Sequence, residues 1–212
     1  MMLYWPKQVK IANILTSEIE LRDLAKAWIA ISIAFAVVMT QPLSGQFLSK
    51  QLYANFIIAS LTVGVGFLLH ELAHKFVAQR YGCFAEFRAS NFFLLLAIVM
   101  SFSGFVFAAP GAVMISGPVG VRRNGKISVA GPVVNLALAS AFLAILFFSP
   151  DGGGLWSAIA LYGFIINSWL VLFNMIPLGN FDGLKILRWN KPAYFAVLAA
   201  SAAFVFMRGV VL

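Results

Sequence analysis

The chain has 212 residues, of which 62% are hydrophobic and 10% are charged, and its mean hydropathy is +0.94. This composition excludes an ordinary soluble domain and predicts a protein that crosses a lipid bilayer several times. The formal net charge of +8 fits basic loops facing anionic lipid. No nucleic-acid partner is expected, because no nucleic-acid-binding motif accompanies the charge. Cys83 is the only cysteine, which excludes an intrachain disulfide.

The first part of the chain predicts a short strand and two membrane spans. Residues 8–11 alternate between polar and apolar types, as a strand does. Ser17, with Glu20 three residues later, is typical of a helix start. The apolar sequences that follow predict spans over about 22–40 and about 52–79.

The middle of the chain allows two interpretations. Residues 92–108 are apolar enough to cross the membrane, but the same segment can also enter and return on one side. Residues 109–116 lie between turn signals and predict a strand. The Asn124-Gly125 pair is a hairpin signal, which predicts pairing of residues 119–121 with residues 127–129.

The rest of the chain predicts further spans over about 130–148, 155–176 and 192–212. The predicted fold is an all-α polytopic membrane protein with five to six transmembrane helices and a small membrane-associated β-hairpin or re-entrant segment. No long polar linker divides the chain, so a single domain is expected over residues 1–212.

A metal-binding motif, His70-Glu71-Leu72-Ala73-His74, lies in the last third of the second predicted span. Histidines four residues apart share a helix face, so both imidazoles can reach one zinc ion at about 2.0–2.1 Å. Glu71 is rotated about 100° around the helix axis and can serve as the general base for a metal-bound water. Both histidines of the chain are in this motif. The alternative interpretation is a structural His-Glu-His cluster between packed helices.

A third zinc ligand is predicted among the carboxylates, because both histidines are already used. Five of the seven acidic residues lie in the first helix, a loop or a glycine-rich turn: Glu18, Glu20, Asp23, Glu86 and Asp151. Asp182 remains, and it follows a helix that ends near Pro177. Asp182 is therefore predicted as the third ligand, with a simple Asp-Gly turn as the alternative.

Membrane topology links these residues. Asp182 and the histidines can meet only if residues 92–108 return instead of crossing. A returning segment also gathers most basic residues on one side, which the positive-inside rule assigns to the cytoplasm. This side would carry Lys7, Lys10, Arg22, Arg80, Arg88, Arg122, Arg123, Lys126, Lys185, Arg188 and Lys191, and Lys50 would lie on the other. The prediction is five spans with the active site toward the cytoplasm, and a six-span chain is the alternative.

Residues 52–187 resemble the site-2 protease family of intramembrane zinc metalloproteases. Three motifs in order carry the resemblance: His70-Glu71-Leu72-Ala73-His74, then Ala130-Gly131-Pro132-Val133-Val134-Asn135, then Asn174-Met175-Ile176-Pro177 leading to Asp182-Gly183. Ala73 replaces the glycine of many members, the second proline common before Asp-Gly is missing, and there is no PDZ-like insertion. The chain therefore resembles a minimal member, with flanking spans over about 22–40 and 192–212.

The resemblance implies that His70, His74 and Asp182 hold zinc and that Glu71 activates water. It also implies that Asn135 and Asn174 face the active site and bind the substrate backbone or the oxyanion. Asn167 is a weaker candidate. For each asparagine the alternative is a hydrogen bond between helices.

The expected function is that of a multi-pass protein of the cell membrane, a zinc-dependent endopeptidase for regulated intramembrane proteolysis. It would cut a peptide bond within or near the transmembrane segment of membrane-anchored substrates. The strand predicted over 109–116 would pair with the unwound substrate by edge addition. The alternatives are a metal-ion transporter or a catalytically inactive homologue that binds membrane proteins. The sequence leaves the substrate's identity and the oligomeric state open.

Overall fold

A computed structural model describes residues 8–11, 14–40, 50–106, 110–148 and 154–211. Its strands are β1 (Gln8–Ile11), β2 (Ile14–Ser17), β3 (Phe84–Ala89) and β4 (Gly111–Ser116). Its helices are α1 (Glu18–Thr40), α2 (Lys50–Ala59), the π-helix η2 (Ser60–Gly64), α3 (Val65–Arg80), α4 (Asn91–Ser101), α5 (Val121–Phe148), α6 (Leu155–Asn174), α7 (Asp182–Trp189) and α8 (Lys191–Val211). The predicted strand over residues 8–11 and the predicted helix start after Ser17 are both confirmed. Asp151, in the predicted glycine-rich turn, lies outside the described residues.

Four helices are long and apolar enough to cross a membrane: Glu18–Thr40, Lys50–Arg80, Val121–Phe148 and Leu155–Asn174. The second consists of α2, η2 and α3 in one continuous run. These helices confirm the first four predicted spans and the all-α membrane fold. Within α8, the segment Lys191–Met207 is one of the shorter apolar helices, so a fifth span stays a prediction.

The α1 helix packs closely on the long helix that carries the metal-binding motif. Small and branched residues form this contact, among them Ala27, Ala30, Ala59 and Val63, and small residues allow helix backbones to approach closely in a membrane. The indole Nε1 of Trp28 donates a hydrogen bond to the Ser60 carbonyl at 3.1 Å. This bond gives a partner to a carbonyl at the start of the π-helix, where the regular α-helical bonding changes.

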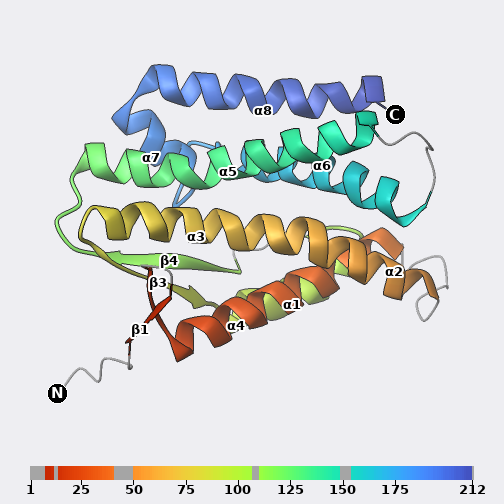
Figure 1. Ribbon diagram of the computed structural model, residues 1–212, viewed down its shortest axis with the longest axis horizontal. Coiled ribbons are helices and arrows are strands. Elements are labelled where there is room, and N and C mark those ends of the chain that lie inside the picture. The colour runs from red at the N-terminus through yellow and green to blue at the C-terminus, as the bar shows by residue number, and fades with distance from the viewer. Residues whose placement is uncertain (1–7, 12–13, 41–49, 107–109, 149–153, 212) are drawn as a thin grey trace.

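The segment between β3 and β4 returns to the place where it started. The two strands pair antiparallel, with Ala89 opposite Gly111, and the Ser90 N–H donates to the Pro110 carbonyl at 2.9 Å. Between these points the eleven residues of α4 span about 16 Å, about half the thickness of the hydrocarbon layer. The structure therefore has the returning segment, and α4 lies alongside α1 (Figure 1).

The predicted hairpin of residues 119–121 with residues 127–129 is wrong. A helix, α5, begins at Val121 and passes through this region. The preceding strand β4 pairs with β3, which lies more than twenty residues before it. Gly125 belongs to the helix packing, because a side chain at this position would collide with Trp189 at the end of α7. The turn preference of an Asn-Gly pair is a local effect, and the packing of this segment on α7 favours a helix over a turn.

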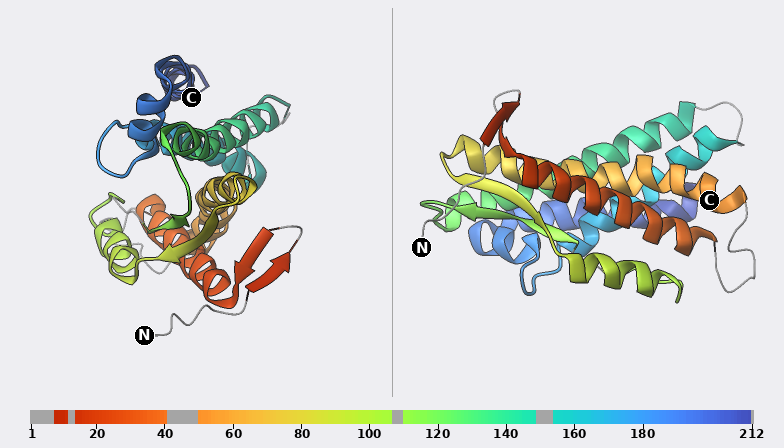
Figure 2. Two further views of the ribbon diagram at one scale, coloured as in Figure 1. Left: turned by 90° about the vertical axis from the view of Figure 1, so that its left-hand side faces the viewer. Right: turned by 90° about the horizontal axis from the view of Figure 1, so that it is seen from below.

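One end of the bundle gathers most of the basic helix termini. The N-terminus of α1, the C-terminus of α3, the N-termini of α5 and α8, and the whole of α7 lie there (Figure 1). Their basic residues are Arg22, Arg80, Arg122, Arg123, Lys126, Lys185, Arg188 and Lys191. Figure 2 shows that α8 and α4 flank the bundle on opposite sides. The one-sided charge distribution expected for a returning segment is therefore present in the fold.

Candidate active site

Three predicted ligands meet at the basic end of the bundle. His70 and His74 come from one face of α3, and Asp182 is the first residue of α7. Asp182 Oδ2 lies 3.3 Å from His70 Nε2 and 3.0 Å from His74 Nε2, and the two Nε2 atoms are 3.0 Å apart. All three residues are buried. The ends of the second and fourth spans thus lie on the same side, as the sequence required.

The three atoms form a triangle that suits zinc. With zinc–ligand bonds of about 2.0–2.1 Å, two ligands of a tetrahedral ion lie about 3.3–3.4 Å apart. The separations of 3.0–3.3 Å in the triangle are close to this value. Two imidazoles and one carboxylate are also a ligand set of catalytic zinc sites, which leave a fourth position for water or substrate.

Helix α5 orients both imidazoles for metal binding. His74 Nδ1 lies 2.8 Å from the carbonyl oxygen of Ile127, which can only accept, so this nitrogen carries the proton. His70 Nδ1 lies 2.6 Å from Asn135 Oδ1. With protons on both Nδ1 atoms, both Nε2 lone pairs face Asp182, and such outer hydrogen bonds fix the tautomer and the ring direction of metal ligands.

Two glycines leave the space that the ligand cluster needs. A Cβ atom at Gly131 would lie 2.5 Å from His74 Nε2 and 2.6 Å from His70 Nε2, where an ion or its water would sit. A Cβ atom at Gly183 would collide with the backbone of Met175 at the end of α6. Gly183 thus lets Asp182 approach the bundle closely enough to face the histidines.

The Asp182 carboxyl is held in its charged form. Burial disfavours the charge, but in the metal-free protein the positive charge of His74 and the hydrogen bonds from protonated His70 and His74 outweigh burial and hold the pKa of Asp182 below its ordinary value. Lys185, one turn along α7, adds an ion pair at 3.7 Å to Asp182 Oδ1. An anionic oxygen is what a zinc ligand requires.

Glu71 stands next to the ligands and faces the β-sheet. It follows His70 on α3, is 9% exposed, and lies close to the backbone N–H of Val113 in β4, against which α3 packs. The predicted general base therefore lies between the ligand cluster and the strand predicted to bind substrate.

The three asparagines have different surroundings. Asn135 and Asn167 are fully buried; Asn135 Nδ2 donates to the Gly66 carbonyl at 3.1 Å and to Asn167 Oδ1 at 2.8 Å. Both N–H groups of Asn135 are thus used within the bundle, and its oxygen serves His70. Asn174 Nδ2 donates to the Leu170 carbonyl of its own helix at 2.8 Å. Substrate binding by Asn135 and Asn174 stays a prediction, and interhelical bonding is observed for Asn135 and Asn167.

Sequence reasoning missed several contributors to the site. The Ile127 carbonyl and Gly131 carry no chemical signal of their own, because a backbone oxygen and a missing side chain matter only through neighbours. Lys75 did offer a signal, since it is a charged residue inside a span directly after His74. Such a charge needs a partner, and the partner is Glu20 of α1.

Comparisons with known proteins agree with this geometry. The "Putative zinc metalloprotease MJ0611" of Methanocaldococcus jannaschii is 44% identical over 146 residues, which cover 68% of this chain and 75% of the relative. The "Putative zinc metalloprotease Rip2" of Mycobacterium tuberculosis is 30% identical over 187 residues in one strain, covering 80% of this chain and 72% of the relative. In another strain Rip2 is 32% identical over 161 residues, covering 68% of this chain and 62% of the relative.

No family model matches the chain, and no solved structure matches it. The predicted zinc cofactor is confirmed, because the relatives are named for zinc and the chain brings together His70, His74 and Asp182 as a possible site. On the strength of the relatives and the ligand cluster, the chain belongs to the family of zinc metalloproteases that includes MJ0611 and Rip2.

Proposed function

We propose that the protein is an intramembrane endopeptidase of the site-2 protease type, which cuts membrane-anchored substrates within or near their transmembrane segments. The observation that carries this proposal is the position of Glu71 between the ligand cluster and β4 on a membrane-spanning helix. His74 and His70 are six and ten residues from the helix end at Arg80, which is about 9 and 15 Å along the axis. The chemistry would therefore take place at membrane depth, within a single domain formed by residues 1–212.

The residues of the site have separable roles. Zinc held by His70, His74 and Asp182 would polarise the scissile carbonyl and acidify water. Glu71 takes a proton from the attacking water and delivers it to the nitrogen of the leaving amine, so that no charge is left unbalanced in the apolar surroundings. Asn135 and the Ile127 carbonyl keep the two imidazoles in the orientation that ligation requires.

The β3–β4 sheet offers one free edge to the substrate. In β3 the N–H groups of Phe87 and Ala89 point away from β4, to Glu20 Oε1 at 2.9 Å and Asp23 Oδ2 at 3.3 Å. These carboxylates cover the outer edge of β3. Residues directly opposite in an antiparallel pair share the same direction of their backbone groups. In β4 the partners Val113 and Gly111 therefore also point away from β3.

The outward groups of β4 lie beside the catalytic base. Val113 meets Glu71, and Ile115, two residues on, has the same outward direction. Within the described residues the sheet has two strands, so no third strand pairs with this edge. A substrate helix must unwind before its carbonyls can be attacked, and an extended segment added to β4 would lie next to Glu71.

The protein would be a multi-pass protein of the cell membrane, with its active site toward the cytoplasm. The basic helix ends described above lie at the same end of the bundle as α7, which begins at Asp182, and the C-terminus of α3 (Figure 1). Positively charged loops favour the cytoplasmic side of a membrane.

Cleavage by purified protein tests the proposed function. Wild type and Glu71→Gln would be loaded with zinc in proteoliposomes and mixed with a single-span model protein whose Leu-Ala transmembrane segment contains a Gly-Pro pair. We expect cleavage by wild type, and equal zinc content but no cleavage for Glu71→Gln. Cleavage that survives in Glu71→Gln would overturn the role of this residue, and an inactive wild type would overturn the proposed substrate class.

The same experiment separates two other functions. A metal-ion transporter would move zinc across the vesicle membrane equally well with either residue at position 71. A catalytically inactive binding protein would hold the model substrate without cutting it. Neither function requires the Glu71 carboxylate, which lies next to the ligands and beside the free edge of β4.

A further inference from the structure

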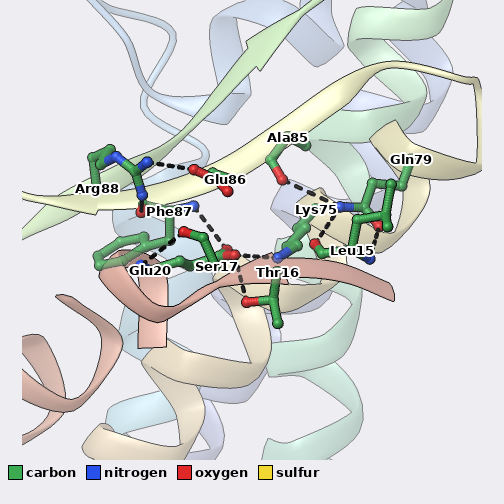
Figure 3. A network of polar contacts seen from close by, with 10 residues as sticks. All are labelled: Leu15, Thr16, Ser17, Glu20, Lys75, Gln79, Ala85, Glu86, Phe87 and Arg88. Carbon is green, nitrogen blue, oxygen red and sulfur yellow. Dashed lines mark hydrogen bonds and ion pairs between the residues drawn. The ribbon is translucent and has the colours of Figure 1, made fainter. Parts of the chain in front are cut away.

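A buried ion pair joins the catalytic helix to the first helix of the chain (Figure 3). Lys75 of α3 is 1% exposed, Glu20 of α1 is 0% exposed, and Lys75 Nζ donates to Glu20 Oε2. Removing two charges from water is costly, and an apolar pair of similar size is often at least as stabilising. The pair is therefore better explained by what it holds in place than by its contribution to stability.

Glu20 also holds the outer edge of β3. Its Oε1 accepts the Phe87 N–H at 2.9 Å, and its Oε2 accepts the hydroxyl of Thr16 at 2.7 Å (Figure 3). Phe87 stands opposite Val113 in the register of the sheet, and Val113 meets Glu71 on the other edge. One rung of the sheet thus has Glu20 bonded at its β3 end and Glu71 close to its β4 end.

The side chains of Glu71 and Lys75, which reach the two edges of the sheet, both belong to α3. Lys75 follows Glu71 by four residues, so the two side chains lie on one helix face, one turn apart. Glu71 meets the edge of β4 directly, and Lys75 reaches the edge of β3 through Glu20. The helix that carries the catalytic base therefore also fixes the position of the sheet.

We infer that Glu20 and Lys75 are positioning residues, which set the free edge of β4 against Glu71 and so select the peptide bond that is cut. This inference rests on the proposed function, because it takes the substrate to pair with β4. Neither residue is a zinc ligand or lies on the free edge. They act through β3, and their loss would let a paired substrate occupy more than one position relative to the catalytic centre.

Two matched double variants test the inference without leaving an unpaired buried charge. Glu20→Gln with Lys75→Gln removes both charges but keeps an acceptor for the Phe87 N–H and an amide donor at position 75. Glu20→Leu with Lys75→Met removes the charges and the acceptor. Both would be loaded with zinc and assayed with the same single-span model protein, and the products would be mapped by mass spectrometry.

The acceptor-keeping variant should cut the wild-type bond, with kcat/KM within about fivefold of wild type, since neutral hydrogen bonds can replace the charged ones at both positions. The variant without the acceptor should retain zinc, lose about tenfold or more in kcat/KM through misplacement of the substrate, and cut neighbouring bonds as well. A loss of folded enzyme would lower the yield without moving the cut. Cleavage confined to the wild-type bond in the Leu-Met variant overturns the inference, whatever its rate.

A second route applies if the Leu-Met variant does not fold. Replacing Phe87 by its α-hydroxy acid turns the N–H into an ester oxygen and leaves the ion pair intact. We again expect cleavage at bonds next to the wild-type one. Cleavage at the wild-type bond alone overturns the inference.

Hydrogen exchange without substrate keeps this inference separate from the proposed function. The amides of β3 and β4 should exchange faster in the Leu-Met variant than in the Gln-Gln variant. Equal exchange in both overturns the inference. An inactive wild-type enzyme, in contrast, overturns the proposed substrate class alone.

Discussion

Asn135 Oδ1 lies 2.6 Å from His70 Nδ1, so a side chain of α5 orients a zinc ligand of α3. The same asparagine donates to Gly66 and to Asn167, and it is fully buried. One amide thus links three helices at the point where the metal would bind. Its role in the structure is to direct an imidazole, and this role makes a specific prediction about metal affinity.

Asn135→Ala should weaken zinc binding by about 10-fold to 100-fold, as is usual when a group that orients a metal ligand is lost. The reason is that His70 would be free to rotate and to exchange tautomers. Competition with a chelator measures the affinity. Asn174→Ala is the matched control, because the Asn174 amide bonds to its own helix and its loss should leave zinc affinity unchanged. Equal affinities for all three proteins would contradict the assigned role.

Asp182→Ala should abolish stoichiometric zinc binding, with a loss of more than about a hundredfold in affinity, because a ligand is removed and not merely its support. Two neutral imidazoles would remain, without the anionic oxygen at 3.0–3.3 Å. Metal analysis of purified protein measures this loss. Glu18→Ala, at an exposed carboxylate, is the control and should keep one zinc ion per chain. Full zinc content in Asp182→Ala would rule out Asp182 as a ligand.

Gly131→Ala should also prevent zinc binding, since the added methyl group would lie 2.5–2.6 Å from both Nε2 atoms. Protein packing resists such overlaps, and overpacking costs about 1–3 kcal/mol, so thermal stability should fall as well. Gly120→Ala is the control, because nothing lies within 4 Å of a Cβ atom there. Zinc titration and thermal unfolding are the measurements, and normal zinc binding in Gly131→Ala would show that the space next to the imidazoles is not needed.

Ile115→Pro should raise KM for the single-span model protein while zinc content stays normal. Proline removes an N–H that points to the free edge of β4, so the bonds between β3 and β4 remain. We expect a loss of about fivefold to tenfold in kcat/KM for one lost hydrogen bond to the substrate. Met114→Ala changes only an exposed side chain and should behave like wild type. Unchanged kinetics in Ile115→Pro would exclude pairing at this edge.

Cysteine labelling in intact cells tests the orientation of the bundle. In a Cys83→Ala background, Arg122→Cys at the start of α5 should be protected from a membrane-impermeant maleimide. Lys50→Cys at the start of α2, on the opposite side, should react. The reason is that positively charged loops stay in the cytoplasm. The reverse pattern would place the active site on the outer side of the membrane.

The sequence alone determined the membrane class, the positions of the main spans and the three candidate ligands. The spans were predictable because twenty apolar residues in a row have few alternatives to a membrane helix. The pair His70 and His74 was predictable because helix geometry is local and places residues four apart on one face. Asp182 followed by elimination among seven acidic residues, and the distances to the histidines agree with it.

Only the tertiary structure decided how the sheet is paired and how the ligands are held. The local turn signal at Asn124-Gly125 gave the wrong hairpin, since helix α5 runs through this region and packs on α7. The strand β4 pairs with a segment far back in the chain, which no local signal indicated. The contacts of Asn135 with His70 and of Glu20 with Lys75 join residues 65 and 55 positions apart. Helix formation depends on neighbouring residues, whereas strand pairing and buried polar contacts depend on which distant segments share the core. For that reason the three candidate ligands could be predicted from the sequence, whereas the distant contacts that orient them could not.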